Sequence, residues 1–62
     1  GWVEVRATEG IQLYRAALYD GKGRKLREWE GGLHGFQLPA PGIYYLLLST
    51  KQGMVIKKLV RQ

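Results

Sequence analysis

The stretch Tyr19-Asp20-Gly21-Lys22-Gly23 decides the fold class, because it ends the longest segment of the chain that could otherwise form a helix. Asp can hydrogen-bond to its own backbone and Gly can take a positive φ, so the stretch predicts a tight turn. A second strand-like run, residues 24–30, follows it directly, with Leu26 expected to point inward. We therefore expect a β-hairpin here, and not a helix.

The segments on the N-terminal side of this hairpin also predict strands. Residues 2–7 alternate, with Val3 and Val5 on one face and Trp2 and Glu4 on the other, which is typical of a half-buried strand. In residues 11–19 the apolar positions change parity near Leu13-Tyr14, and we expect a bulge or a break there.

The C-terminal side continues the pattern of short strands and turns. Residues 33–38 predict a short strand, and the two prolines of residues 39–42 predict an extended turn. Residues 43–50 are apolar on both faces, which favours a central strand covered on both sides. Residues 51–53 predict a hairpin loop and residues 54–61 the last strand. Six strands without a linker predict one compact all-β domain, a sandwich or a barrel.

Length, composition and charge limit the function classes. Sixty-two residues without cysteine form one small domain that no disulfide stabilises, and one histidine without a thiol nearly excludes a structural zinc site. The longest apolar run, residues 43–48, is far shorter than the ~20 residues that span a bilayer. The net charge of +5 favours anionic partners without choosing among them. Because the chain begins with glycine, we interpret it as part of a longer protein.

Residues that could support catalysis are few and separated. His34 is the only histidine and lies beside a loop, and Ser49 is the only serine and has no histidine in its segment. Glu28 and Glu30 share a strand face, for which a solvated surface is the simpler interpretation. We expect no enzyme activity, no cofactor and no metal site.

Nucleic-acid binding by a small basic barrel is the least favoured interpretation. The basic residues of positions 22–27, with Trp29 behind them, could form a stacking platform for a single strand. However, Arg24 and Arg27 differ in parity, so one strand does not present all of them on one face. We also expect most of the seven aromatic residues to occupy core positions.

Three segments carry a resemblance to a known family. Residues 18–26, Leu-Tyr-Asp-Gly-Lys-Gly-Arg-Lys-Leu, match the hairpin pattern V-Y-D-x-x-G-R-x-V. Residues 38–46 are similar to L-P-x-G-x-Y-x-L, with one extra residue between the first proline and the glycine. Together with the short basic and apolar ending of residues 57–62, they resemble the C-terminal sorting domains of the type IX secretion system. Nothing matches that family's tyrosine-proline-asparagine-proline-like opening segment.

The resemblance implies a small immunoglobulin-like antiparallel β-sandwich of six to seven strands without catalytic activity. Residues 1–62 would be a single C-terminal sorting domain of a larger secreted protein in a Gram-negative bacterium. The domain would direct its cargo from the periplasm through the outer-membrane translocon to the cell surface. The implied partners are translocon or shuttle proteins of the outer membrane, with a sortase that removes the domain and anionic lipopolysaccharide as the anchor in most members.

The last strand is the expected recognition element. If it lies at a sheet edge, its free backbone groups could add a strand of a receptor, and its basic side chains would favour an acidic one. The residues assigned to recognition are Lys57, Lys58, Leu59, Val60, Arg61 and Gln62. In the alternative interpretation, Leu59 and Val60 close the sandwich and the lysines keep its edge soluble.

A second set of residues is expected to build turns and fold. It comprises the family-motif residues Asp20, Gly23, Arg24, Pro39, Gly42 and Tyr44. We expect a contact between Asp20 and Arg24 across the turn, and a hydrogen bond from the Tyr44 hydroxyl to nearby backbone.

The main alternative function is a non-catalytic binding module of a secreted protein, which would hold a polysaccharide or another protein. Trp2 and Trp29 are the candidates for its aromatic platform. Unpaired edge strands could also pair two copies of the chain into an edge-strand dimer.

Overall fold

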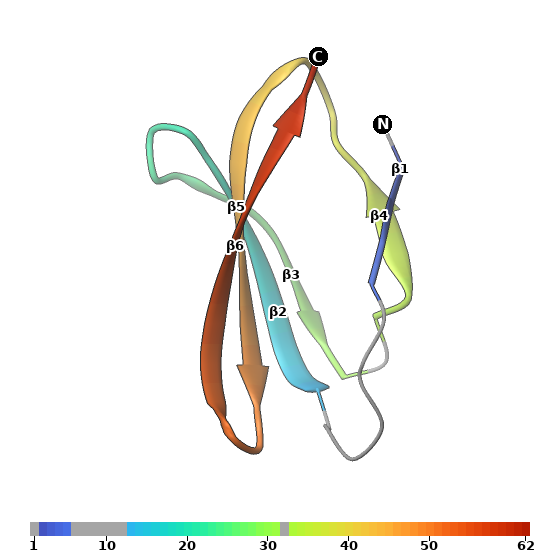
Figure 1. The fold of residues 1–62 in the computed structure, drawn as a ribbon, viewed down its shortest axis with the longest axis vertical. Coiled ribbons are helices and arrows are strands. Elements are labelled where there is room, and N and C mark those ends of the chain that lie inside the picture. The colour runs from blue at the N-terminus through green and yellow to red at the C-terminus, as the bar shows by residue number, and fades with distance from the viewer. Residues whose placement is uncertain (1, 6–12, 32) are drawn as a thin grey trace.

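The computed structural model describes residues 2–5, 13–31 and 33–62, which form six strands and no helix (Figure 1). The all-β class is therefore confirmed. The strands are β1 (Trp2–Glu4), β2 (Leu13–Asp20), β3 (Lys25–Glu30), β4 (Gly35–Gln37), β5 (Gly42–Thr50) and β6 (Gly53–Arg61). The strand predicted over residues 33–38 is shorter than expected. The outer parts of two further predicted strands, residues 6–7 and 11–12, lie outside the described residues.

The strands form two antiparallel sheets. The larger sheet has the order β3-β2-β5-β6, and the smaller one pairs β1 with β4. The larger sheet consists of two hairpins, β2–β3 and β5–β6, which are joined by the pairing of β2 with β5. Strand β5 is central in its sheet, as predicted, and β3 and β6 are the two edges.

The hydrophobic core lies between one face of the larger sheet and the smaller sheet. Leu18 of β2 pairs with Leu46 of β5, and their exposed fractions are 1% and 3%. Phe36 of β4 is buried in the same cluster. The other members and the half-buried side chains around them are Ala16, Leu38 and Tyr44, with Val3, Val5, Leu26, Trp29, Leu33, Leu48 and Leu59. The inward positions predicted for Val3, Val5 and Leu26 are thus confirmed.

The pairings of β2 with its two neighbours each contain one irregularity. The register of β2 with β5 shifts between Leu13 and Arg15, where the change of parity predicted a bulge, so this prediction is confirmed. Its register with β3 shifts between Leu18, opposite Arg27, and Tyr19, opposite Lys25, so the extra residue of this second bulge is Leu26 of β3. The second shift was not predicted. A bulge increases the local twist of the strand that contains it.

The prediction that β5 is covered on both faces is wrong. Tyr44 and Leu46 point into the core, but Ile43 and Tyr45 are 44% and 37% exposed. The smaller sheet lies beside one face of the larger sheet (Figure 1), so no described strand covers the other. We call this the outer face; Tyr45 of β5 and Lys58 of β6 lie opposite each other on it.

The prediction that most aromatic residues occupy the core is also wrong. Phe36 and Tyr44 are buried, and Tyr19 and Trp29 are half-buried. Trp2, Tyr14 and Tyr45 are exposed. A small second sheet has too little area to cover all seven rings.

Candidate functional site

Strand β6 is a free edge of the larger sheet. It pairs with β5 from Gly53 to Arg61 without a register shift, and no described strand pairs with its other side. Its nine residues therefore present a continuous row of backbone groups to which another strand could bond. The recognition role proposed for the last strand required a position at a sheet edge, and β6 has that position.

The predicted recognition residues alternate between the two faces of β6. Lys58 and Val60 share the outer face, whereas Lys57 and Leu59 lie opposite the core residues Leu46 and Tyr44. Leu59 is half-buried and packs against the core, which supports the alternative role proposed for it. Val60 is 60% exposed, so it does not close the sandwich.

The remaining side chains of this edge are basic or apolar. Lys57, Lys58 and Gln62 are exposed and Arg61 is half-buried. No ion pair joins these three cations to a described residue. The sequence explains why: residues 33–62 contain four basic residues and no acid, whereas residues 1–32 hold six basic residues and all five acids.

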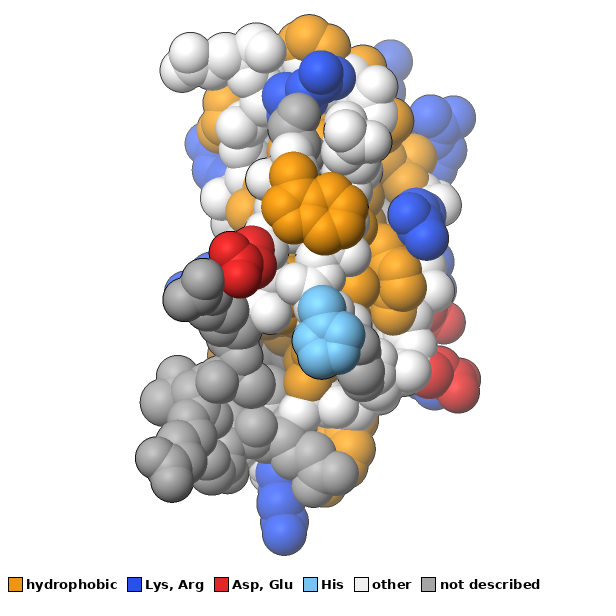
Figure 2. All heavy atoms as spheres, turned by 90° about the vertical axis from the view of Figure 1, so that its right-hand side faces the viewer, with side chains coloured by type: hydrophobic (Ala, Val, Ile, Leu, Met, Phe, Trp, Pro, Cys, Tyr) orange, Lys and Arg blue, Asp and Glu red, His pale blue; other side chains and the backbone are white. Residues whose placement is uncertain are grey.

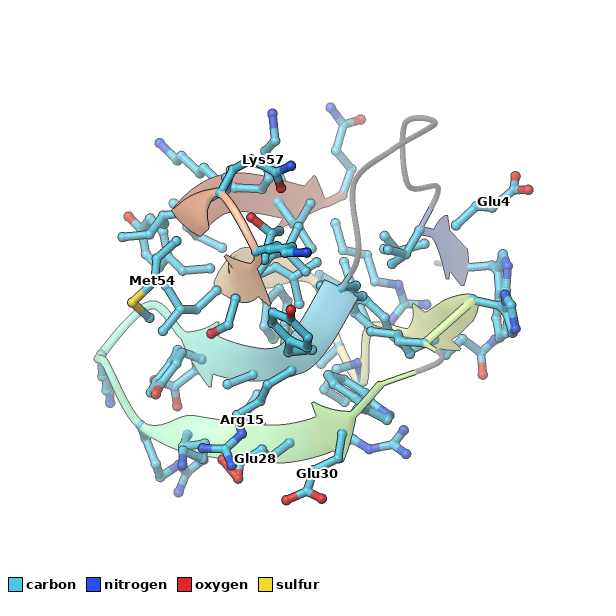
Figure 3. All side chains as sticks on the ribbon, turned by 90° about the horizontal axis from the view of Figure 1, so that it is seen from below. Glu4, Arg15, Glu28, Glu30, Met54 and Lys57 are labelled. Atoms are coloured by element: carbon cyan, nitrogen blue, oxygen red, sulfur yellow. The ribbon has the colours of Figure 1, made fainter. Side chains whose placement is uncertain are left out.

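Two acidic side chains, Glu28 and Glu30, lie on the opposite edge strand β3. Figure 3 shows Lys57 at the β6 edge and Glu28 and Glu30 at the β3 edge. Arg15 Nη2 lies 3.6 Å from Glu30 Oε1, and Lys25 Nζ donates a 3.0 Å hydrogen bond to Glu28 Oε2. This hydrogen bond lowers the pKa of Glu28 and raises the pKa of Lys25. The two carboxylates share a strand face, as predicted, and each has its own cation.

The turn between β2 and β3 is organised by Asp20. Its Oδ1 accepts 2.9 Å hydrogen bonds from the backbone N–H groups of Lys22 and Arg24, and its Oδ2 lies 3.3 Å from Arg24 Nε. The bond from the Arg24 N–H contributes most to lowering the pKa of Asp20. Gly23 has φ 86°, a conformation that side-chain-bearing residues rarely adopt. The predicted contact of Asp20 with Arg24 is confirmed.

A second turn is closed by Tyr44. Its hydroxyl donates a 2.6 Å hydrogen bond to the Ala40 carbonyl and accepts a 3.2 Å hydrogen bond from the Ala40 N–H. The predicted bond of this hydroxyl to nearby backbone is therefore confirmed. Pro39 precedes the bonded residue, and Gly42, with φ 150°, begins β5.

The two family-motif turns meet at the same end of the larger sheet. Asp20 lies opposite Tyr44 in the register of β2 and β5. The residues of both turns line a shallow, open hollow of about 530 Å³, formed by Asp20, Gly21, Lys22, Arg24, Pro41, Gly42, Ile43 and Tyr44. Gly42 also pairs with Arg61, so this end of β6 lies next to the turns. The sequence alone did not place the two turns together, because their proximity requires the pairing of β2 with β5.

Of the residues considered for catalysis, Glu30 and Ser49 line one shallow hollow on either side of Arg15, and His34 is not part of it. His34 is exposed, and its backbone carbonyl accepts a 2.9 Å hydrogen bond from the Val5 N–H. Ser49 is half-buried and lies opposite Arg15 and Met54. Among the residues that the structure describes, no group of three or more His, Cys, Asp or Glu side chains could hold a metal ion.

The two tryptophans are not arranged alike. Trp29 is half-buried, with its ring 5.0 Å from that of Phe36 and the Arg27 guanidinium 4.8 Å above it. Trp2 is 67% exposed, and its indole lies against Gly35, where a Cβ would come within 2.6 Å of the ring. Figure 2 shows this side of the molecule, with hydrophobic side chains in its middle and Lys and Arg side chains toward its margins.

Three of the four basic residues considered for nucleic-acid binding contact other side chains within the fold, and Lys22 is exposed. Arg24 contacts Asp20, Lys25 contacts Glu28, and Arg27 stacks on Trp29. Among the described residues, the cations without such contacts are Lys22 and Lys51 in two turns and Lys57, Lys58 and Arg61 on β6.

One exposed apolar surface was not predicted from the sequence. On the outer face, Ile43 and Tyr45 of β5 lie next to Val60 and Ile56 of β6, and Met54 extends the row. The exposed fractions of Met54, Ile56 and Val60 are 60% or more. The apolar odd positions 43–47 predicted a covered face, and the apolar positions 54, 56 and 60 of the last strand were not predicted to share it.

Comparisons with known proteins add no relative: no family model, no curated protein and no solved structure matches the chain. Within the described ranges, no helix is long and apolar enough to cross a lipid bilayer.

Proposed function

We propose that this chain is a C-terminal sorting domain of the type IX secretion system, folded as a small immunoglobulin-like sandwich. It acts by being bound and not by catalysis. In a Gram-negative bacterium it directs its cargo from the periplasm through the outer-membrane translocon to the cell surface, where a sortase removes it and anionic lipopolysaccharide receives the cargo.

The observation that carries the proposal is the free edge β6. A transport signal has to be recognised without involving the chemistry of the cargo, and an exposed strand edge provides backbone groups that a receptor can pair with. The nine-residue length of β6 and its regular register fit this use. The exposed Lys57 and Lys58 add a preference for an acidic partner and speed its encounter.

The motif turns support the same proposal in a different way. Asp20 and Tyr44 make the hydrogen bonds that hold the two turns, and both turns lie at the Arg61 end of β6. Their residues therefore act through the fold, because they fix the end of the edge that the receptor binds.

Surface display tests the proposal. A reporter with an N-terminal signal for the periplasm is fused ahead of residues 1–62 and expressed in a bacterium with a type IX system. We expect display on the cell surface, and loss of display in a strain without the translocon. Equal display in both strains would rule the proposal out.

Truncation and matched substitutions test the role of β6. Removal of residues 57–62 should leave the reporter in the periplasm. Lys57→Ser with Lys58→Ser should reduce display, whereas Lys22→Ser with Lys51→Ser removes the same charge from two exposed turns and should not. Display that is indifferent to the truncation would show that recognition lies elsewhere.

A further inference from the structure

We propose that β6 pairs with a partner strand whose sequence reads two apolar residues, two acidic residues and two apolar residues. A third acidic residue lies at one end of this pattern. This inference rests on the proposed function, because it names the chemistry of the strand that the receptor would supply. The juxtaposition that carries it is a free nine-residue edge whose cations have no partner among the described residues.

The pattern follows from the side chains of β6. Residues 55–60 read Val-Ile-Lys-Lys-Leu-Val, two apolar, two basic and two apolar residues. In a paired strand each side chain lies beside the residue directly opposite on the same face, and opposite charges or apolar pairs stabilise that arrangement. Carboxylates are therefore required opposite Lys57 and Lys58, and apolar side chains opposite the residues on either side.

Because one lysine lies on each face of β6, both faces favour an acidic side chain in the partner strand. Lys58 points to the outer face, between Ile56 and Val60. Lys57 points to the other face, between Val55, which is 41% exposed, and the half-buried Leu59. A partner strand therefore needs an acid between apolar residues on each of its own two faces.

A second copy of the chain does not meet this requirement. Lys57 is the middle residue of β6, so two antiparallel copies in full register would place Lys57 opposite Lys57. Like charges directly opposite each other are destabilising. Residues 33–62 contain no acidic residue that could lie opposite Lys57 in place of the second lysine.

The direction of the partner strand is set by Arg61. The six-residue pattern opposite residues 55–60 is the same when read in either direction, so it does not by itself distinguish a parallel from an antiparallel strand. An acid opposite Arg61 distinguishes the two directions, because it lies at the N-terminal end of an antiparallel partner and at the C-terminal end of a parallel one. Because antiparallel pairing is the more stable per residue, and every pairing in this fold is antiparallel, we assign the third acid to the N-terminal end of the partner pattern.

A synthetic peptide tests the inference. The capped heptapeptide Glu-Val-Leu-Glu-Glu-Ile-Val is titrated into the isotopically labelled 62-residue chain, and amide chemical shifts are followed along both edges. We expect saturable shifts in β6 with none in β3, and binding that weakens as salt is raised. A peptide of the same composition with its three acids adjacent should bind about tenfold more weakly, since its charges no longer align.

Charge exchange supplies the decisive control. Lys57→Glu with Lys58→Glu should lose the acidic peptide and gain the peptide Glu-Val-Leu-Lys-Lys-Ile-Val, whose first residue still places an acid opposite Arg61. Lys22→Glu with Lys51→Glu makes the same change of net charge and should keep the preference for the acidic peptide. Lys57→Gln with Lys58→Gln provides a milder variant with the same expected direction, and circular dichroism verifies the fold of each.

Several results would overturn the inference. They are equal loss of binding in the two charge-reversed variants, shifts centred on β3, no binding of the acidic peptide, and a dimer of the unmodified chain through β6. If display requires β6 but the peptide fails, the inference is wrong and the proposed function stands. If the peptide binds as described but display is independent of the translocon, the proposed function is wrong and the inference stands.

Discussion

The two edges of the larger sheet, β3 and β6, resist pairing with other chains by different means. Strand β3 has six residues and a register shift beside Lys25, and its charged side chains contact others within the fold. Strand β6 has nine residues in unbroken register, and its lysines have no ion-pair partner in the described parts of the chain.

This difference shows which edge is available. A bulge and a short length hinder the pairing of an edge strand by geometry, whatever the sequence of the other strand. Exposed lysines repel a basic strand, and burying them against an uncharged strand leaves a charge unpaired, but they attract an acidic strand. The edge of β3 therefore resists pairing with any strand, whereas the edge of β6 resists uncharged or basic strands and accepts acidic ones.

The largest effect is expected from Leu46→Ala, because both edges depend on the same core. Leu46 is 3% exposed and pairs with Leu18 across the junction of the two hairpins. Loss of a buried leucine typically costs about 2–5 kcal/mol, which is much of the stability of so small a domain. Urea unfolding followed by tryptophan fluorescence measures the loss, and amide exchange should accelerate at β3 and β6 together.

The matched control for this variant is Ile56→Ala, on the outer face and 67% exposed. We expect a change of about 0.5 kcal/mol or less in the free energy of unfolding. If the two variants were equally destabilised, the assignment of inner and outer faces would be wrong.

A change of association state is expected when β6 loses its lysines. Lys57→Val with Lys58→Val would create a long apolar edge without charge, which favours edge-to-edge pairing and aggregation. Sedimentation velocity should show assemblies at concentrations where the unmodified chain has none. Lys25→Val with Arg27→Val removes the same charge from β3 and should assemble far less, because the bulge and the short length remain; equal assembly would contradict the comparison.

A moderate effect is expected from Tyr44→Phe, which removes the hydroxyl that bonds to both backbone groups of Ala40. Leaving these groups without their partner costs about 1–3 kcal/mol. Amide exchange should increase first at the end where Gly42 pairs with Arg61. Tyr45→Phe, at a 37% exposed position, should change stability little, and equal effects would argue against the role of the turn.

The smallest effect is expected from acid, and it should appear at the β3 side. The hydrogen bonds of the β2–β3 turn hold the pKa of Asp20 below its usual value of 3.8. A carboxyl whose pKa is lowered by folding stabilises the fold above its unfolded pKa, and this contribution is lost as the pH falls through the folded pKa. The amide signals of Lys22 and Arg24 should therefore shift below pH 3.8.

Two observations check this acid response. Asp20→Asn should show a smaller loss of stability between about pH 5 and pH 2 than the unmodified chain. The internal amides of β6 should change little in the same range, since residues 33–62 contain no Asp or Glu. A larger shift in β6 than in the turn would contradict the assignment.

Features that depend on neighbours in the sequence could be predicted. The bonds of Asp20 to residues 22 and 24, and of Tyr44 to Ala40, span at most four residues, so turn chemistry is sufficient to expect them. The irregularity near Leu13 follows from the parity of apolar positions in one strand.

Features that depend on distant strands could not be predicted from the sequence. The shift at Leu18 is determined by which residue of β3 lies opposite, and one strand's pattern does not contain this information. The exposure of Ile43 and Tyr45 follows from the lack of a described strand over the outer face, although their hydropathy is that of a core. The edge position of β6 was only a condition of the recognition hypothesis, because strand order depends on long-range pairing. The absence of ion pairs at its cations also required the ion pairs of β3 to be known.

The junction of β2 with β5 has a consequence for the order of folding. Each hairpin joins strands that are adjacent in the chain, and isolated hairpins form in roughly 1–10 μs. The β2–β5 junction has to bring together Asp20 and Tyr44, across the β3 and β4 segments, and such long-range closure is slower. We expect the β5–β6 hairpin to be assembled before the sheet is complete, so its nucleation would not wait for the rest of the domain.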